Sequence, residues 1–239
     1  MISFIVPAHN EEHELPATLR ALRAAADAAA QQPYEIIVVD DASTDATSRI
    51  AREFGARVVP VHLRQIAAVR NAGAVQARGD IFFFVDADTH ISARNITAGL
   101  EALDAGCVGG SARFKLDRAV PLWARIFIFV FCALYFAGNL GIGAFIFTRR
   151  EDFEAVGGFD EQYFAGEEMY LTLALRKRGR FIIQREPITT SARKVRMHPP
   201  TWLLWKWLVM MLGGKRILRR RESLALWYDG KREDAATAR

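Results

Sequence analysis

The stretch IFFFVDADTH, residues 81–90, joins five apolar residues to two aspartates that are separated by a single alanine. A run of five apolar residues suits a strand that is buried in a covered sheet. Asp86 and Asp88 follow directly, so the strand delivers two carboxylates to its carboxyl end. In open α/β sheets, ligands bind beyond the carboxyl ends of the strands. The stretch therefore predicts a ligand site built on a buried strand.

The residues before this stretch alternate short apolar runs with helical patterns. Apolar runs that suit strands occupy residues 2–7, 34–41 and 56–61, and the fourth run is 80–88. Helical patterns lie between the runs, including residues 64–77. Continuous apolar strands that alternate with helices require a sheet whose two faces are both covered. We therefore predict an α/β fold with a mostly parallel central sheet flanked by helices.

The composition fits one large domain, or one domain with an appendage. Hydrophobic residues make up 51% of the 239 positions, which is ample for a sizeable core. The net charge of +5 favours an anionic partner such as a nucleotide, a nucleic acid or a membrane surface. Two cysteines, Cys107 and Cys132, are too few for a disulfide framework and favour a reducing compartment. The opening residues MISFIVPAHNEE lack the features of a signal peptide, so we expect a cytoplasmic protein.

Three of the predicted strands end in polar residues that a parallel sheet brings to one edge. These residues are Pro7 to Glu11, then Asp40 and Asp41, then Asp86 and Asp88. Several carboxylates at one edge would repel one another unless a cation neutralised them. Hard oxygen ligands suit Mg²⁺ or Mn²⁺, and Mg²⁺ typically brings phosphate with it. The sequence therefore predicts a metal–phosphate site, and no histidine spacing that would suit zinc is present.

The second half of the chain is more apolar than the first. No charged residue lies between Arg125 and Arg149, and by length this interval is a candidate transmembrane segment. Glycines interrupt the interval, however, and it leads directly into a polar turn. We predict an apolar helix at about 122–137 and a buried strand at about 143–148, with insertion of 126–148 into a membrane as the alternative.

The segment 199–221 combines tryptophan, leucine and methionine with basic residues. Nine lysines and arginines, and no acidic residue, lie between Arg193 and Arg221. Tryptophan with cations is typical of a segment that lies in a membrane interface, here including residues 202–213. An amphipathic helix packed on the sheet is the alternative, and both stay open. A nucleic-acid partner is not expected, because these apolar side chains suit lipid better than bases.

Four motifs, in this order and spacing, resemble those of the family 2 glycosyltransferases with the GT-A fold, which is a Rossmann-like α/β architecture. The motifs are FIVPAHNEE (4–12), IIVVDDASTD (36–45), VRNAGAVQARGDIFFFVDAD (69–88) and VGGFDEQYFAGEEMYLTLALRKRG (156–179). The resemblance implies transfer of a sugar from a nucleotide-sugar to an acceptor hydroxyl, usually with inversion. The Gln-x-x-Arg-Trp motif of processive synthases is missing, which favours a single-domain, non-processive enzyme.

The resemblance also implies roles for individual residues. Family positions that hold the nucleotide match Pro7, His9, Glu11, Asp41, Arg70 and Asp86. Asp86-Ala87-Asp88 matches the family's DxD motif, whose first aspartate meets the ribose and the metal and whose last aspartate ligates the metal. The metal would be Mn²⁺ or Mg²⁺, and its charge would stabilise the departing diphosphate. UDP is favoured over GDP by family habit, and the sugar is not legible.

The acceptor needs a general base, and the family's common pattern for it is Glu-Asp. Here the pair is Glu167-Glu168, so Glu168 is the expected base although its side chain is one methylene longer. A base must lie within hydrogen-bonding distance of the proton that it takes, so Glu167 stays open as a substitute. By analogy and charge, Arg193 and His198 are candidates for closing over the diphosphate.

These expectations divide the chain into three parts. Residues 1–190 form the glycosyltransferase domain, with a nucleotide-binding half (1–112) and an acceptor half (113–190). Residues 191–228 form a basic C-terminal helical segment, followed by a solvated tail at 229–239. The acceptor is left open, with a lipid or lipid-linked hydroxyl at the membrane surface among the candidates. Two other functions stay open: a nucleotidyltransferase, although its Gly-rich loop is missing, and a non-catalytic nucleotide-sugar-binding or membrane-scaffold protein.

Overall fold

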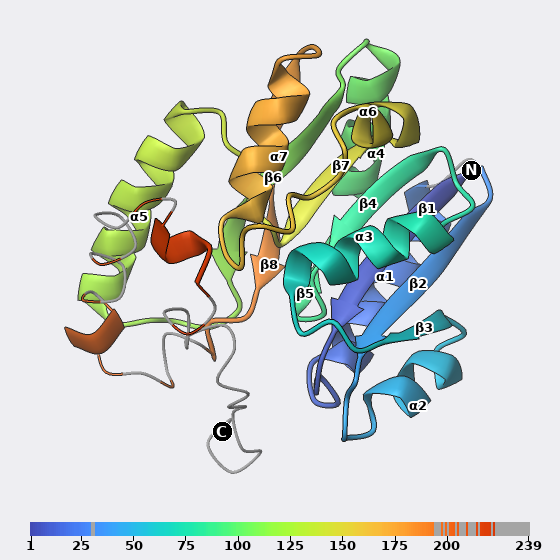
Figure 1. The fold of residues 1–239 in the computed structure, drawn as a ribbon, viewed down its shortest axis with the longest axis horizontal. Coiled ribbons are helices and arrows are strands. Elements are labelled where there is room, and N and C mark those ends of the chain that lie inside the picture. The colour runs from blue at the N-terminus through green and yellow to red at the C-terminus, as the bar shows by residue number, and fades with distance from the viewer. Residues whose placement is uncertain are drawn as a thin grey trace.

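The computed structural model describes residues 1–29 and 32–193, and beyond them residues 197, 199, 201–203, 205, 209, 214, 216–220 and 222. In this part of the chain the strands form one sheet in the order β3-β2-β1-β4-β7-β6-β8-β5 (Figure 1). The strands are β1 (Ile2–Ala8), β2 (Tyr34–Asp41), β3 (Arg57–Val61), β4 (Ile81–Val85), β5 (Thr89–His90), β6 (Gly109–Leu116), β7 (Phe145–Arg149) and β8 (Phe181–Thr190). The helices are α1 (Leu15–Ala29), α2 (Thr47–Glu53), α3 (Ile66–Gln76), α4 (Ala93–Asp104), α5 (Leu122–Ala137), α6 (Arg150–Ala155) and α7 (Glu167–Arg176).

The first half of the sheet is parallel, as predicted. Strand β1 lies between β2 and β4, and Ile2 is in register with both Tyr34 and Ile81. Strand β3 adds to the outer side of β2. The carboxyl ends of β1, β2 and β4 therefore meet at one edge of the sheet. Strand β4 ends at Val85, so the aspartates of the opening stretch lie just outside it, although the sequence pattern extended the strand to residue 88.

The second half of the sheet is mixed. Strand β7 runs antiparallel to both β4 and β6, while β6 and β8 are parallel to each other. The predicted α/β fold is confirmed, and parallel pairs outnumber antiparallel pairs in the sheet. Strand β6 crosses the predicted boundary at residue 112, and it shares the sheet with β1. The two proposed halves of the domain therefore share a common sheet.

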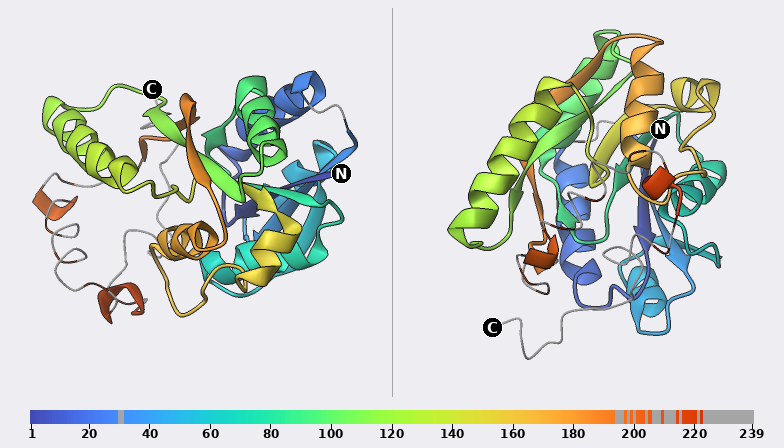
Figure 2. Two further views of the ribbon diagram at one scale, coloured as in Figure 1. Left: turned by 90° about the horizontal axis from the view of Figure 1, so that it is seen from above. Right: turned by 60° about the vertical axis from the view of Figure 1, so that its left-hand side comes forward.

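The alternating side chains of β4 fill two separate cores. Phe83 and Val85 pack on the face that α1, α2 and α4 cover, whereas Phe82 and Phe84 pack on the face that α3, α6 and α7 cover (Figures 1 and 2). All four side chains have no exposed surface, and burial of each stabilises the fold by roughly 1.5–3 kcal/mol. This two-sided burial explains why the run is continuously apolar. It also makes β4 a rigid support for the two aspartates that follow.

A glycine lets α3 approach the sheet closely. A Cβ atom added at Gly73 would lie 2.4 Å from Cγ2 of Ile5 and 2.8 Å from Cγ2 of Val39, and real side chains do not tolerate such distances. The close approach buries Arg70, which lies three residues earlier on the same helix. The glycine in the RNAG motif therefore serves to set the depth at which Arg70 lies.

The apolar second half forms the two predicted elements. Helix α5 spans Leu122–Ala137, and strand β7 follows at Phe145–Arg149, two residues later than predicted. Figures 1 and 2 place α5 at the opposite end of the molecule from α2. Among the described residues, no helix is both long and apolar enough to cross a membrane.

The predicted C-terminal segment, 191–228, lies largely outside the described residues, and the tail at 229–239 lies wholly outside them. Its described part contacts the domain at several points, and one of them is Leu218. Leu218 is buried against Tyr163 and Ala165, and its carbonyl oxygen accepts a hydrogen bond from the amide of Phe164 at 2.8 Å. The chain therefore returns to the loop that precedes α7.

Candidate active site

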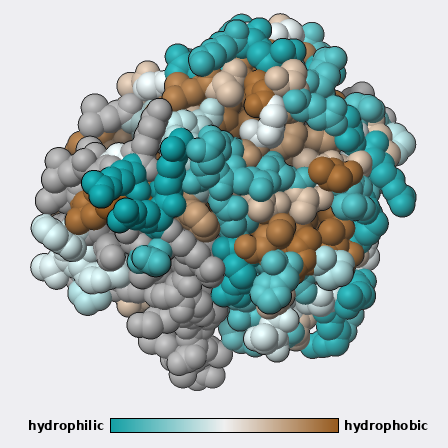
Figure 3. Space-filling model, viewed as in Figure 1, coloured by the Kyte–Doolittle hydropathy of each residue, from teal (hydrophilic) through white to brown (hydrophobic). Residues whose placement is uncertain are grey.

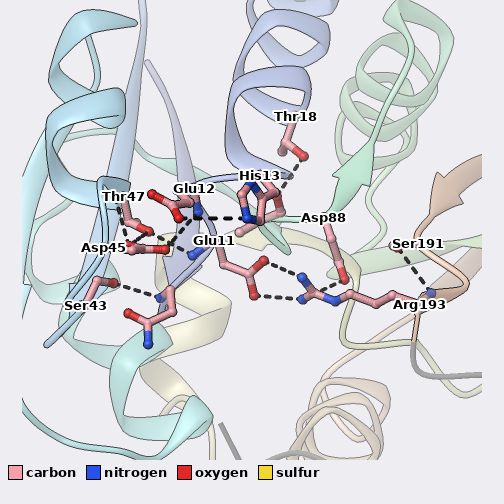
Figure 4. Close-up of polar contacts among 12 residues, drawn as sticks. Glu11, Glu12, His13, Thr18, Ser43, Asp45, Thr47, Asp88, Ser191 and Arg193 are labelled. Atoms are coloured by element: carbon pink, nitrogen blue, oxygen red, sulfur yellow. Dashed lines mark hydrogen bonds and ion pairs between the residues drawn. The ribbon is translucent and has the colours of Figure 1, made fainter. Parts of the chain in front are cut away.

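The loops that follow β1 and β2 are tied together by short polar contacts. The amide of Asn10 donates to the Ser43 hydroxyl at 2.9 Å, and the amide of Glu11 donates to the Thr47 hydroxyl at 2.8 Å (Figure 4). The amide of Glu12 donates to Asp45 at 3.1 Å. These contacts fix the first loop against the second.

Backbone strain is concentrated in the same region. Asn10, Ala42 and Arg64 all have positive φ, at 54°, 55° and 52°, and each follows one of the strands β1 to β3. A left-handed backbone is unfavourable for alanine and arginine, and such strain persists only where the surroundings fix it, often at functional sites. The strained loops therefore mark this edge of the sheet as a candidate binding region.

Asp41 and His9, two of the predicted nucleotide-binding residues, lie together. One carboxylate oxygen of Asp41 accepts hydrogen bonds from the amides of Leu63 and Arg64, at 2.7 and 3.0 Å. Nδ1 of His9 lies 2.8 Å from the carbonyl oxygen of Asp41, and a guanidinium nitrogen of Arg64 lies 2.6 Å from Nε2 of His9. Pro7 pairs with Val39 inside the sheet, one residue before β1 ends. The arrangement gathers an imidazole, a carboxylate and a guanidinium at the ends of β1 to β3.

Arg193 bridges two further predicted residues, Glu11 and Asp88. Its guanidinium donates to both carboxylate oxygens of Glu11, at 2.6 and 2.7 Å, and lies 3.1 Å from Oδ2 of Asp88 (Figure 4). The three side chains are between 8% and 16% exposed, so water screens the pairs weakly. Burial alone would lower the pKa of Arg193, but Glu11 and Asp88 outweigh it and raise that pKa. The arginine is therefore permanently charged, and it neutralises a site rich in carboxylates.

Arg70 makes a second bridge, between Asp86 and Glu167. Its guanidinium donates to Asp86 at 2.7 Å, to Glu167 at 2.5 Å and to the carbonyl oxygen of Gly143 at 2.9 Å. The side chain is 2% exposed and lies over the ring of Phe159, 5.2 Å from its centroid. Burial opposes its charge, yet the neighbouring carboxylates raise the pKa of Arg70 above its ordinary value. One buried arginine thus joins the end of β4 to the start of α7.

The two glutamates of α7 differ in accessibility. Gly166, with φ of 75°, turns the chain sharply into the helix, and Glu167 points into the core at 3% exposure. Glu168 keeps part of its surface exposed. Burial, followed by the charge of Glu167, raises the pKa of Glu168 to about 8. Burial also raises the pKa of Glu167, although Arg70 opposes the shift. Glu167 is held in an ion pair, and Glu168 is the more accessible carboxylate.

The loop between β4 and β5 holds the two aspartates in place. The Thr18 hydroxyl on α1 donates to the carbonyl oxygen of Ala87 at 2.8 Å. The amide of Asp86 donates to Ala144, and the amide of Ser191 donates to the carbonyl oxygen of Asp88. Segments far apart in the sequence therefore determine where the two carboxylates point.

The carboxylates of Asp86 and Asp88 fit a metal that phosphate helps to hold. No group of three or more His, Cys, Asp or Glu side chains among the described residues is arranged to hold an ion. Mg²⁺, however, is commonly bound through one or two carboxylates together with substrate phosphates. The guanidinium of Arg193 lies against Asp88, so a cation is already favoured at that carboxylate. The donor set suits a metal that arrives with a diphosphate.

Most of the residues predicted from sequence lie in this region. Arg193, proposed only by analogy and charge, contacts both loops, whereas His198 lies outside the described residues. Sequence reasoning missed Arg64, whose position directly after the third strand could have indicated it. It also missed the carbonyl oxygen of Gly143, which no side-chain pattern reveals.

Three comparisons relate the chain to known proteins. The profile of Glycosyl transferase family 2 matches residues 3–157. The undecaprenyl-phosphate 4-deoxy-4-formamido-L-arabinose transferase of Aeromonas hydrophila is 35% identical over 127 residues, which cover 49% of this chain and 38% of that protein. Glycosyltransferase AglE of Haloferax volcanii is 25% identical over 183 residues, covering 72% of this chain and 60% of AglE. The alignment with the Aeromonas transferase thus spans well under half of that relative's length.

Solved structures share the fold. The mannosyltransferase PcManGT from Pyrobaculum calidifontis, in complex with GDP-Man and Mn²⁺, superposes with a TM-score of 0.68 at 18% identity. That match covers 91% of this chain and 62% of PcManGT. Residues 1–349 of S. aureus TarS in complex with UDP-GlcNAc superpose with a TM-score of 0.61 at 22% identity, covering 80% of this chain and 58% of that one. At these identities the likeness concerns the fold, which is that of the GT-A glycosyltransferases.

Proposed function

The chain belongs to glycosyltransferase family 2, and we propose that it transfers a sugar from a nucleotide-sugar to an acceptor hydroxyl by a single inverting displacement. The observation that carries the proposal is the pair of arginine bridges, which bring Glu11, Asp86, Asp88 and Glu167 into one site. Family membership supplies the reaction class, and the bridged carboxylates supply the groups that this reaction needs.

The nucleotide would lie along the carboxyl ends of β1 to β3. Pro7, His9 and Asp41 would meet the base and ribose there, on loops whose hydrogen bonds already fix them. Solved relatives bind either UDP-GlcNAc or GDP-Man, so the fold accommodates both bases. We retain UDP as the favoured base on family habit alone.

A divalent cation, Mn²⁺ or Mg²⁺, would be held by Asp88 with help from Asp86. When bound, such a cation neutralises the diphosphate as negative charge develops on it. Support comes from the Mn²⁺ in the related mannosyltransferase and from the hard oxygen donors after β4. Arg193 would then shift its contact from Asp88 to the diphosphate, because both it and the metal compete for that carboxylate.

Glu168 would remove the proton from the acceptor hydroxyl. Glu167 is engaged by Arg70, so it serves to hold the start of α7 rather than to receive a proton. A base is most effective when its pKa lies near the working pH, and the pKa of Glu168 is about 8. Inversion needs this base and no nucleophile, which agrees with the residues gathered at the site.

The acceptor is proposed to be a lipid-linked hydroxyl at a membrane surface. Relatives named for transfer to undecaprenyl phosphate support this class, although they match only part of the chain. The basic, tryptophan-rich segment at 199–221 supports it as well, by composition. The free cysteines Cys107 and Cys132 suit the cytoplasmic side of that membrane.

Calorimetry with UDP and GDP, each with Mn²⁺, Mg²⁺ or chelator, tests the donor site. We expect one nucleotide to bind only when metal is present. Slow hydrolysis of the matching nucleotide-sugar would then demonstrate that the site is catalytic. If neither nucleotide binds under any condition, the chain is a non-catalytic scaffold with the family fold, and the proposed transfer is wrong.

A further inference from the structure

Helix α5 exposes a continuous apolar stripe. Its exposed residues recur every three or four positions, as one face of a helix requires. They are Leu122, Arg125, Ile126, Phe129, Val130, Ala133 and Ala137. Leu122 is 68% exposed and Phe129 is 74% exposed, and the stripe runs the full length of the helix. A face of this kind on a folded domain marks an interaction site.

Other exposed apolar side chains are scattered. Half of the large hydrophobic residues that are exposed in the described part of the chain lie on α5, whereas Leu63 precedes α3 and Val75 lies on it. On the face that carries α3, small hydrophobic patches are interspersed with hydrophilic residues (Figure 3). Single apolar side chains at a surface are normal, whereas a stripe is not. The feature is therefore specific to α5.

The other side of α5 faces the candidate active site. The hydroxyl of Tyr135 donates to the carbonyl oxygen of Gly141 at 2.9 Å, inside the domain. The amide of Gly141 in turn donates to the hydroxyl of Thr172 at 3.1 Å, and Thr172 lies on α7, one helical turn after Glu168. Asn139 and Arg176 anchor the end of the helix through hydrogen bonds to Phe181 and Gly138. The C-terminal end of α5 is thus linked to α7, the helix that carries the proposed base.

The charged residues that neighbour the stripe in the sequence are mostly basic. No acidic residue lies between Asp117 and Glu151. Arg125 lies on the stripe itself, and Arg113 and Lys115 are exposed on the strand that leads to the helix. An anionic lipid surface attracts cations through its headgroups and buries an apolar helical face at the boundary with its acyl chains. The two features of α5 therefore complement such a surface. A protein partner would not require this combination.

The length of α5 decides how it could meet a bilayer. Sixteen residues give a helix of about 24 Å, which is shorter than the roughly 30 Å hydrocarbon core. The C-terminal end of the helix is also tied to the domain, through Tyr135 and through Asn139 just beyond it. It can therefore lie in the interface plane but cannot span.

We propose that the outer face of α5 is a docking surface for an anionic phospholipid bilayer. Docking there would hold Glu168 on the protein side of α5, one helix away from the lipid headgroups. The inference rests on the proposed function in one respect, since only a lipid-linked acceptor makes this orientation useful. The docking surface itself depends only on the exposed side chains and charges of α5 and its flanking residues.

Flotation of the full chain with vesicles tests the surface without any substrate. Vesicles of equal parts phosphatidylglycerol and phosphatidylcholine are compared with vesicles of phosphatidylcholine alone. We expect the double variant Ile126→Ser/Phe129→Ser to lower the partition coefficient on anionic vesicles by about tenfold or more, because the apolar face no longer inserts. The matched control, Val75→Ser/Leu173→Ser, removes exposed apolar side chains elsewhere and should bind as the unchanged chain does.

The charge is tested separately. Arg125→Gln should weaken binding by about fivefold on anionic vesicles and leave the weak binding to phosphatidylcholine unchanged, because one cation near such a surface contributes at that level. Thermal midpoints of all variants should match the unchanged chain, since every replaced residue is exposed.

Two outcomes would overturn the proposal. Unchanged vesicle binding by the Ile126→Ser/Phe129→Ser variant would place membrane contact elsewhere, such as the segment at 199–221. A dimer in solution that this variant converts to monomer, with vesicle binding intact, would show that α5 contacts a second copy. Metal-dependent nucleotide binding should be the same in all variants, so failure of the docking surface is distinguishable from failure of the proposed transfer.

Discussion

After β2, at the proposed donor edge of the sheet, backbone amides hold Asp41 and Asp45, whereas at the start of α7 one buried guanidinium holds Glu167. Asp41 accepts from two amides of the loop after β3, and Asp45 accepts from the amides of Glu12 and Thr47. Glu167, in contrast, depends on Arg70, which also holds Asp86. In the first arrangement the hydrogen bonds come from several loops, whereas in the second both ion pairs depend on one residue, Arg70.

The two arrangements have opposite effects on ionisation. Burial alone would raise the pKa of Asp45, but hydrogen bonds from Thr47 and the Glu12 amide outweigh it and lower that pKa. At Glu168, burial and the neighbouring Glu167 raise the pKa to about 8. Asp45 is therefore charged at neutral pH, and it helps to hold the loops of the proposed donor edge in place. The acceptor side is poised to exchange a proton, which suits a base.

The strongest test of this comparison replaces Arg70, the one residue on which the second arrangement depends. Arg70→Met should destabilise the fold by about 3–5 kcal/mol, because Glu167 and Asp86 lose their shared partner and Glu167 is left buried. Urea unfolding measures the loss. Arg49→Met is the matched control, since it removes an exposed pair with Glu53 that contributes about 0.5 kcal/mol or less. A loss as small as the control's would show that Arg70 does not hold the site together.

A substitution at the proposed donor edge should change nucleotide binding and turnover rather than the stability of the fold. Asp88→Ala should abolish metal-dependent nucleotide binding and lower turnover by about 100-fold or more, since the leaving diphosphate loses its metal. Calorimetry with and without chelator measures the first effect. Asp80→Ala, which replaces an aspartate that is 80% exposed, is the control and should leave both unchanged. Full activity in Asp88→Ala would mean that the metal is bound elsewhere or not needed.

The reaction rate should depend on pH through the proposed base, Glu168. A base acts when deprotonated, so kcat/KM should rise with pH and level off above about 8, and Glu168→Gln should lower it by about 10²–10⁴-fold and remove the rise. The same shift affects stability. Because the folded state raises the pKa of Glu168 from 4.5 to about 8, it binds the extra proton in this window, and stability falls as pH rises through it.

Unfolding of Glu168→Gln at several pH values checks this second effect. The variant should show a flatter decline than the unchanged chain between pH 4.5 and 8, because the amide does not ionise. Glu12→Gln is the control, since that side chain carries no role at the base. If the pH–rate rise persisted in Glu168→Gln, another group would be the base, and Glu167 would be the first to examine.

The comparison also separates what the sequence could and could not predict. Strands β1 to β4 were predictable because each is a continuous apolar run, and the aspartates after β4 were predictable because they end such a run. The placement of β7 between β4 and β6 was not, since no local pattern specifies which strand a chain returns to. The contact of Arg193 with Glu11 joins residues 182 positions apart, so only the folded chain reveals its geometry. The stripe on α5 was hidden because a helix that is apolar all round resembles a buried one.

The smallest expected effect concerns the loop that leads into α7, where the C-terminal part of the chain contacts the domain. Arg219 donates to the hydroxyl of Tyr163 at 3.2 Å and lies 4.9 Å from the centroid of its ring, and Tyr163 stacks on Tyr170. Because Arg219 is exposed, Arg219→Ala should cost only about 0.5–1 kcal/mol, which lowers the thermal midpoint by about 1–4 °C.

Arg220→Ala is the matched control for this last substitution, since Arg220 is equally basic and exposed but has no described contact with the ring of Tyr163. It should leave the midpoint unchanged. The two variants carry the same charge, so a difference between them isolates the contact from the general loss of a cation. If both lowered the midpoint equally, the loop before α7 would be supported by charge rather than by Arg219.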